Sequence, residues 1–215
     1  KDQKILLERY NVNIDRSMNR LSQAENAIGS SVQVLQRIHE LSIQARNDTY
    51  NAGDRAAIAM EIKNLREQML SLANTRDSNG QYIFAGYKVE TKPFVQDQDG
   101  VIQHFGDRGV HTLQISDNQR ISTSLDGADV FLRIPQEEGV VDVFSTIDAF
   151  IEQLDEGEMD DSHIDRIGGM MEHFSLQQTK LGSQMNRANL QREINDKRLL
   201  LMNEDISNLE DADLA

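Results

Sequence analysis

The sequence has no cysteine, only two prolines among its 215 residues, and 5% aromatic residues. The absence of cysteine excludes disulfides, thiol nucleophiles and cysteine-ligated zinc, although it does not indicate a compartment. No apolar run approaches the 18 residues that a membrane-spanning helix requires, and Lys1–Val12 does not resemble a secretory signal. The scarcity of aromatic side chains favours aliphatic helix packing over a large aromatic-lined pocket.

Positive charge is also scarce. The chain has 22 Lys and Arg against 36 Asp and Glu, a formal net charge of −14. Such a chain repels nucleic acid and anionic lipid, so neither is expected as a partner. The imbalance is largest between residues 134 and 165, where eleven carboxylates occur without a Lys or Arg. We interpret this acidic segment as solvated surface, with a site for a cation or a basic partner as the alternative.

The most regular pattern in the sequence runs from Ile164 to Leu209. Apolar residues recur there at alternating steps of three and four, interrupted only by Gln178, Arg192 and Asn195. A seam that repeats every 3.5 residues predicts one helix, roughly 70 Å long, that lies along another helix. Ser162, with an aspartate three residues later, is the predicted N-cap. The adjacent polar positions 192 and 195 are typical of layers that fix helix register at a cost in stability.

Two further helical segments precede this one. Apolar seams predict a helix over about Ile5–Asp48 and a second over about Asp54–Thr75, with Asp54 as the expected N-cap of the second. The short connection between them makes these helices antiparallel neighbours. A short amphipathic helix is expected within the acidic segment, around residues 144–154. Residues 1–80 and 139–215 are therefore predicted to form one discontinuous helical rod, a long antiparallel bundle or coiled coil.

Between the helices, from Gln81 to Pro135, the periodicity changes. Short β-rich pieces alternate with turn signals such as Asp99-Gly100 and Asp117-Asn118, and both prolines of the chain fall here. The pattern predicts a small antiparallel β domain, residues 81–138, inserted into the rod. The fold class is therefore α+β, mainly α. The expected strands are Tyr82–Tyr87, Pro93–Gln96, Val101–Phe105, Val110–Ile115, Ile121–Leu125 and Val130–Ile134.

The sequence offers little for catalysis. It contains no nucleophile elbow, phosphate-binding glycine loop or His-Glu-x-x-His motif. We therefore predict no enzyme, no catalytic or cofactor-binding residue and no cofactor. One hypothesis for a metal site is a hairpin turning at Asp107-Arg108, which would bring His104 and His111 directly across from each other, although two ligands make a weak site.

The ends of the rod are the candidate contact surfaces. The first and last helices are expected to extend beyond what the shorter second helix can cover, so apolar side chains at their ends lack a partner within the chain. We therefore predict contacts between subunits at these ends. The functional alternative from another class is a soluble module that binds a metal or a peptide. The predicted interface residues are Ile5, Leu6, Ile206, Leu209 and Leu214.

The run from Leu65 to Tyr87, with NGQYIFAG at Asn79–Gly86 and Pro93-Phe94 after it, resembles the flagellin superfamily. Within it, the run is most similar to the hook-associated protein 3 family of hook–filament junction proteins. The last residues, ISNLEDADLA at 206–215, are similar to the tail motif of that family. The extreme termini of the family are missing, so we expect the natural chain to continue at both ends. The arginine- and aspartate-rich motif of flagellin N-terminal regions is also absent, and flagellin itself stays the alternative.

The resemblance implies a structural adaptor of the bacterial flagellum, exported through the flagellar secretion channel without a cleaved signal and located outside the cell. The partners that it implies are further copies of the chain, forming a homo-oligomer in the assembled flagellum, together with the first hook-associated protein, flagellin and a flagellar export chaperone. It implies no binding of nucleic acid or of a membrane. The β insertion would then lie on the outer surface of the assembly.

Overall fold

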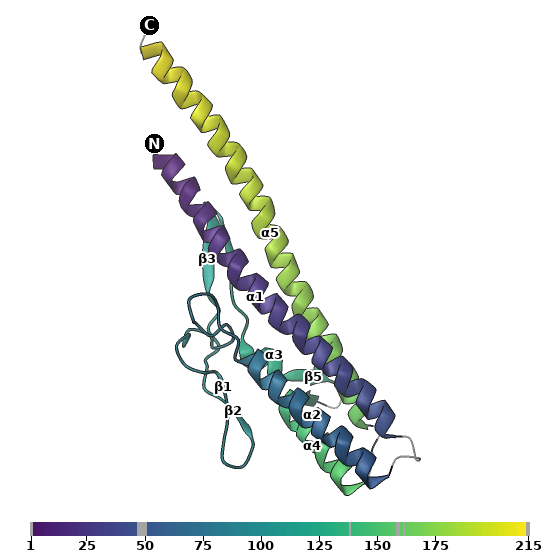
Figure 1. The fold of residues 1–215 in the computed structure, drawn as a ribbon. Helices are drawn as coiled ribbons and strands as arrows, with labels where there is room; N and C mark the ends of the chain where they lie inside the picture. The colour runs from purple at the N-terminus through teal and green to yellow at the C-terminus, as the bar shows by residue number, and fades with distance from the viewer. Residues whose placement is uncertain (1, 47–50, 138, 158–159, 161, 214–215) are drawn as a thin grey trace.

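A computed structural model describes residues 2–46, 51–137, 139–157, 160 and 162–213 of the chain. It is a rod of long helices with the strands gathered along one side (Figure 1). Both ends of the chain lie at one end of the rod, which we call the open end; the opposite end, where the first two helices meet, is the closed end. No helix within the described residues is both long and apolar enough to cross a membrane.

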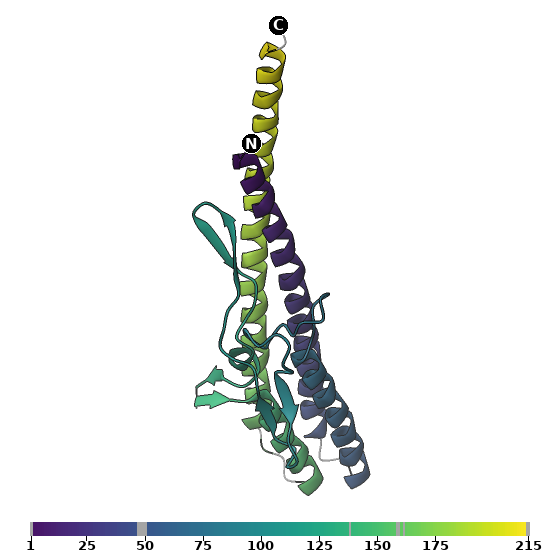
Figure 2. The same ribbon diagram turned by 90° about the vertical axis from the view of Figure 1, so that its left-hand side faces the viewer.

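The rod is built on two helices, α1 (Asp2–Ala45) and α5 (Ser162–Asp213), which run antiparallel in close contact (Figures 1 and 2). The seam predicted in α5 faces inward: Ile167, Phe174 and Leu181 are buried, and none of the seam positions from 164 to 206 is exposed. The prediction of one long helix lying along another is therefore confirmed. The predicted N-cap is wrong, because Ser162 is the first helical residue and donates its backbone N–H and hydroxyl to the Asp160 carboxylate at 3.0 and 2.6 Å.

Two shorter helices, α2 (Ala52–Ala73) and α4 (Val143–Glu156), complete a bundle near the closed end. The N-cap of α2 is Asn51, whose Oδ1 accepts the N–H groups of residues 53 and 54. Asp54, the predicted cap, is instead the third residue of the helix, and its carboxylate accepts the Asn51 N–H at 3.0 Å. Each side chain thus satisfies a backbone donor of the other residue, a capping box that stabilises the start of the helix.

The predicted β region forms three separate two-stranded antiparallel ribbons instead of one sheet. Apart from a single bridge between Tyr82 and Arg76, Tyr82–Tyr87 forms turns and not a strand, because its backbone groups bond singly to separate segments: the Tyr82 N–H donates to Val89, the Ile83 N–H to Thr75, and the Ala85 carbonyl accepts from Asp107. The end of the predicted domain, residue 138, lies outside the described residues, and the division into two domains stays a prediction. The ribbons are β1 (Phe94–Gln96) with β2 (Ile102–His104), β3 (Thr112–Ser116) with β4 (Gln119–Ser122), and β5 (Ile134–Gln136) with β6 (Gly139–Val141), and the short helix α3 (Gly127–Phe131) precedes β5.

Phenylalanines join the ribbons to the helices in one hydrophobic core. Six of the seven in the chain are buried, and Phe131 of α3 lies at the centre of a cluster of five. Its ring lies 5.2 Å from that of Phe84, 5.3 Å from that of Phe94 and 5.4 Å from that of Phe174, each in an edge-to-face arrangement that aromatic pairs prefer. The few aromatic residues of the chain are thus concentrated where the insertion meets the rod.

Candidate assembly surface

The open end of the rod carries apolar side chains that have no partner within the described part of the chain. Contacts of Asn11 with Asn195 and of Glu25 with Gln178 set an antiparallel register that places Asp2 beside about residue 204 of α5, since both helices rise equally per residue. Beyond that level α5 continues alone to residue 213 (Figure 1). The longer helix therefore presents a face that α1 does not cover.

A groove of about 390 Å³ lies at this end between α1, α5 and the turn of the β3–β4 ribbon. Its lining combines apolar side chains with charged ones, the usual composition of a site that receives an amphipathic helix. Leu201 is 60% exposed and Ile5, just outside the groove on α1, is 63% exposed. The lining residues are Gln3, Leu6, Leu7, Asp117, Arg198, Leu201, Met202 and Asp205.

The five predicted interface residues divide among several environments. Ile5 is exposed, Leu6 is half-buried and lines the groove, and Ile206 is half-buried. The side chain of Leu209, and Leu214 as a whole, lie outside the described residues. The sequence reasoning missed Leu201, although the run from residue 199 to 202 is wholly apolar and a helix cannot turn four consecutive side chains toward one partner.

A buried polar layer lies between the groove and the core. Asn195 is fully buried, and its Nδ2 donates to Asn11 Oδ1 at 3.1 Å and to the Ile115 carbonyl at 3.2 Å. Its Oδ1 accepts from Gln191 Nε2 at 2.8 Å. One side chain thus links α5 to α1 and to β3, and any shift in helix register would leave these buried groups unsatisfied. Next to this layer, Arg192 forms an ion pair with Asp15.

Replacing Asn195 with Ala is expected to lower the free energy of unfolding by about 1–3 kcal/mol, because the substitution leaves buried hydrogen-bonding groups without partners. Urea denaturation followed by circular dichroism measures this loss. The matched control is Asn186→Ala, at an exposed position of the same helix, where the higher helix propensity of alanine should stabilise slightly. Equal stabilities of the two variants would show that the polar layer contributes nothing.

The turn of the β3–β4 ribbon is held against α1 by side chains. The Tyr10 hydroxyl donates to Asp117 Oδ1 at 3.1 Å, and Asn13 Nδ2 donates to the Gln114 carbonyl at 2.8 Å. Burial, and next the hydrogen bond to Asp117, raise the pKa of Tyr10, so its hydroxyl keeps its proton and acts as the donor. Asp117 lines one side of the groove, and these hydrogen bonds therefore hold that side against α1.

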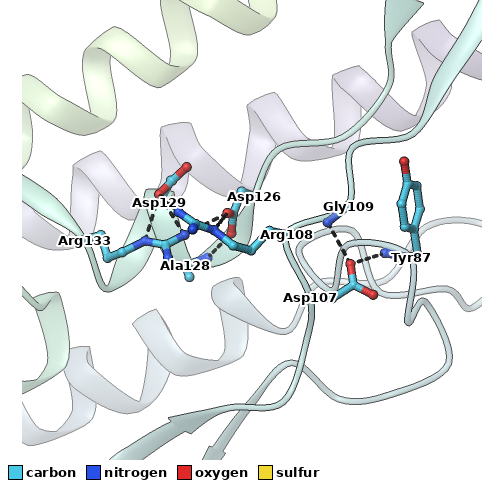
Figure 3. A network of polar contacts seen from close by, with 8 residues as sticks. All are labelled: Tyr87, Asp107, Arg108, Gly109, Asp126, Ala128, Asp129 and Arg133. Carbon is cyan, nitrogen blue, oxygen red and sulfur yellow. Dashed lines mark hydrogen bonds and ion pairs between the residues drawn. The ribbon is translucent and has the colours of Figure 1, made fainter.

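The NGQYIFAG stretch has a structural role at the other side of the aromatic cluster. Gly86, its last residue, has φ +69°, and Asp107 Oδ1 accepts the N–H groups of Tyr87 and Gly109 at 2.8 and 2.7 Å (Figure 3). These two donors lower the pKa of Asp107 because they stabilise its ionised form. The carboxylate thus joins the end of the stretch to the loop that leads into β3.

Two arginines and two aspartates beside this loop form a closed network (Figure 3). Asp126 caps α3 through the Ala128 N–H at 3.0 Å and pairs with Arg133 at 2.8 Å and with Arg108 at 3.3 Å. Asp129 also pairs with Arg133, at 2.8 Å. The two positive and two negative charges balance and each carboxylate has a partner, so the arrangement stabilises the loop.

The hairpin that was expected to join His104 and His111 does not form. His104 ends β2 and pairs with Phe94 of β1, whereas His111 precedes β3. The His104 ring packs against Phe94 and burial lowers its pKa, while His111 Nε2 lies 3.1 Å from the Gly86 carbonyl. Nowhere in the described ranges do three or more His, Cys, Asp or Glu side chains gather as metal ligands.

Comparison with known proteins finds similarity to flagellar proteins. Residues 3–89 match the family model of the bacterial flagellin N-terminal helical region. Flagellar hook-associated protein 3 of Escherichia coli is 43% identical over 79 residues, which are 37% of this chain and 25% of that protein. The protein of the same name from Salmonella typhimurium is 35% identical over 112 residues, 52% of this chain and 34% of that protein. The matched part therefore spans a quarter to a third of the length of these relatives.

Comparison of the folds gives a similar result. The crystal structure of flagellar hook associated protein-3 from Legionella pneumophila superposes with a TM-score of 0.88 and covers 98% of each chain, at 18% sequence identity. At 18% identity the superposition shows a common fold and nothing more. The similarity in sequence rests on the two hook-associated proteins and the family model described above. The chain is thus similar in sequence to flagellar hook-associated protein 3 and to the N-terminal helical region of bacterial flagellin, the resemblance that its NGQYIFAG stretch predicts.

Proposed function

We propose that this chain is a non-enzymatic adaptor subunit at the hook–filament junction of the bacterial flagellum, where it assembles with copies of itself and with neighbouring axial proteins through helix packing. The observation that carries the proposal is the unpartnered apolar end of the α1–α5 pair in a chain similar in sequence to hook-associated protein 3. The charged network of Arg108, Asp126, Asp129 and Arg133 is paired internally, which supports a structural role for the loop that carries it.

The chemistry of the open end supports axial assembly. Leu6, Leu7, Leu201 and Met202 offer an apolar lining that water solvates poorly, and Arg198 in the same lining would pair with a carboxylate of the arriving chain. A helix laid into this groove would continue the α1–α5 packing from one subunit into the next. The proposed neighbours are the first hook-associated protein on one side and flagellin on the other.

The location follows from the same proposal. The subunit would act outside the cell after export through the flagellar channel, kept from premature association by an export chaperone that covers its apolar ends. Its net charge of −14 opposes contact with nucleic acid and with anionic lipid surfaces.

Leu201→Glu, introduced into the chromosomal gene, is expected to reduce filament attachment and swimming at least about tenfold, because burying an unpaired carboxylate in an apolar contact costs several kcal/mol. Electron microscopy of hooks and assay of flagellin in the medium provide the readout: hooks should remain while flagellin is shed. The matched control is Leu176→Glu, at a position of α5 that is 53% exposed and outside the groove. Normal filaments in the Leu201→Glu strain would contradict the proposal.

Flagellin itself is the second candidate, favoured by the match of residues 3–89 to the flagellin family model. Deleting the gene separates the two functions. Loss of a junction subunit leaves hooks and releases intact flagellin into the medium, whereas loss of the filament subunit leaves hooks with no flagellin in the medium.

A further inference from the structure

The turn at residues 77–81 carries a pair of residues that is open to chemical modification. Asn79-Gly80 is the one Asn-Gly pair in the sequence, and both residues are exposed. Gly80 has φ +79°, and nothing lies within 4 Å of the position that a Cβ would take. Because glycine has no side chain, nothing shields its backbone nitrogen from the neighbouring side-chain amide of Asn79.

The reaction that such a pair undergoes in water is deamidation. The Gly80 nitrogen loses its proton to hydroxide and bonds to Cγ of Asn79. The bond from Cγ to the side-chain nitrogen breaks, and ammonia leaves with a proton from water, so that a succinimide ring remains. Water then opens the ring: hydrolysis at the main-chain carbonyl carbon gives isoaspartate, and hydrolysis at Cγ gives aspartate. Ammonia is lost, water is gained, and nothing is oxidised or reduced.

The backbone and carboxylate of Asp77 oppose this reaction. The Gly80 N–H donates to the Asp77 carbonyl at 2.9 Å. Asp77 Oδ1 accepts the N–H groups of Asn79 and Gln81 at 2.9 and 3.0 Å, and the Asp77 N–H donates to the Gln81 carbonyl at 2.8 Å, which closes the turn. Attack on Asn79 requires the Gly80 hydrogen bond to break, and the nearby negative charge disfavours removal of the amide proton.

Arg20 of α1 holds Asp77 in this position. Its guanidinium donates to Asp77 Oδ2 at 2.9 Å and to the Tyr82 carbonyl, just after the turn, at 3.2 Å. The side chains of Arg20 and Asp77 are only 12% and 7% exposed, so salt screens their attraction less than that of a surface pair. The turn is therefore fixed to the rod through its first residue.

A second turn has the same hydrogen bonds. Asp97 Oδ1 accepts the N–H groups of Asp99 and Val101 at 3.0 and 2.9 Å, and the Gly100 N–H donates to the Asp97 carbonyl at 3.2 Å. An exposed neutral side chain takes the place of Arg20 here, since Gln103 Nε2 donates to Asp97 Oδ2 at 3.0 Å. Asp99 can form the same ring with Gly100 by losing water, so this turn is an internal reference.

We infer that Asn79 is a site of spontaneous deamidation and that Asp77, held by Arg20, controls its rate. Conversion is slow while the turn is closed and fast once it opens. Isoaspartate places an additional carbon atom in the backbone between residues 79 and 80, so the modified chain cannot form the same turn again. A carboxylate at position 79 would also be repelled by Asp77.

Peptide mapping by mass spectrometry, after incubation of the purified chain at mildly alkaline pH, measures isoaspartate and aspartate at position 79. The folded chain should form them at least about tenfold more slowly than the chain unfolded in guanidinium chloride, because the hydrogen bonds of the turn add to the barrier. Equal rates in the two states, or no product in the unfolded chain, would overturn the inference. This comparison needs no substitution.

Asp77→Ala should accelerate the conversion at position 79 of the folded chain at least about fivefold, because the carboxylate and its hydrogen bonds are lost. The matched control is Asp97→Ala, which should leave the rate at position 79 unchanged and accelerate isomerisation at Asp99. Circular dichroism checks that both variants are folded. Equal rates at position 79 in the two variants, or an equal rise at positions 79 and 99 in Asp77→Ala, would refute control by Asp77.

Discussion

Phe131→Ala is expected to lower the free energy of unfolding by about 3–5 kcal/mol, the usual loss when a buried phenylalanine is truncated. Phe131 is fully buried, and its ring contacts Phe84, Phe94 and Phe174, which come from the NGQYIFAG stretch, from β1 and from α5. The cavity would open where the insertion meets the rod, at a point fixed from several sides and unable to collapse. Urea denaturation measures the loss.

Phe105→Ala is the matched control for this variant. Phe105 is the one phenylalanine outside the core and is 51% exposed, so its removal should change stability by less than about 1 kcal/mol. A loss of similar size in both variants would show that the Phe131 cluster does not hold the insertion to the helices.

Gly86→Ala is the second substitution with a large expected effect, a loss of about 3 kcal/mol or more. The backbone of Gly86 has φ +69°, which for an L residue costs about 1–2 kcal/mol. A Cβ at this position would also lie 2.1 Å from Asp107 Oδ1 and 2.4 Å from the Asp107 carbonyl oxygen. Relief of that clash requires Asp107 to move, which breaks its hydrogen bonds to Tyr87 and Gly109.

Gly80→Ala separates the cost of the backbone conformation from the cost of the clash with Asp107. Gly80 lies in the same stretch with φ +79°, yet a Cβ there would meet nothing within 4 Å. This control should therefore show only the backbone term, about 1–2 kcal/mol, in the same denaturation experiment. If both alanine variants lose equal stability, the packing of Asp107 against Gly86 is not what makes the glycine necessary.

The helices could be predicted from sequence because their cause is local. A seam repeating every 3.5 residues needs only a partner helix, and residues 164–209 carry that seam with few interruptions. The polar layer at Asn195 was also visible as a break in the seam. Its partners were not, since Asn11 and the Ile115 carbonyl come from segments 184 and 80 residues away.

The β region was predicted less well because its structure depends on distant parts of the chain. Alternation and turn signals locate strands but do not say which strands pair, so His104 was placed opposite His111 when its actual partner is Phe94. The stretch from Tyr82 to Gly86 is buried, and its backbone groups bond to single partners in separate segments, among them Thr75, Val89 and Asp107, instead of to one neighbouring strand.

The position of the candidate surface could be predicted from the sequence in part. Comparing helix lengths predicts uncovered ends, and Ile5 and Leu6 do lie at the open end of the rod; their role in an interface stays a prediction. The groove itself depends on Asp117, which the Tyr10 hydroxyl holds at the open end across 107 residues of sequence. No pattern within either segment signals that contact.

The division of the insertion into three ribbons has a consequence for how such a surface can diversify. In a continuous sheet, lengthening one hairpin changes the twist and pairing of every neighbour. Here each ribbon contacts the helices through its own residues, with hydrogen bonds from Asn74 to Phe94 of β1, from Asn13 to Gln114 of β3 and from Gln136 of β5 to Arg166, so a change in one ribbon does not alter the pairing of the others. Homologous chains can therefore differ in the exposed turns of the ribbons while the helical rod keeps the same dimensions.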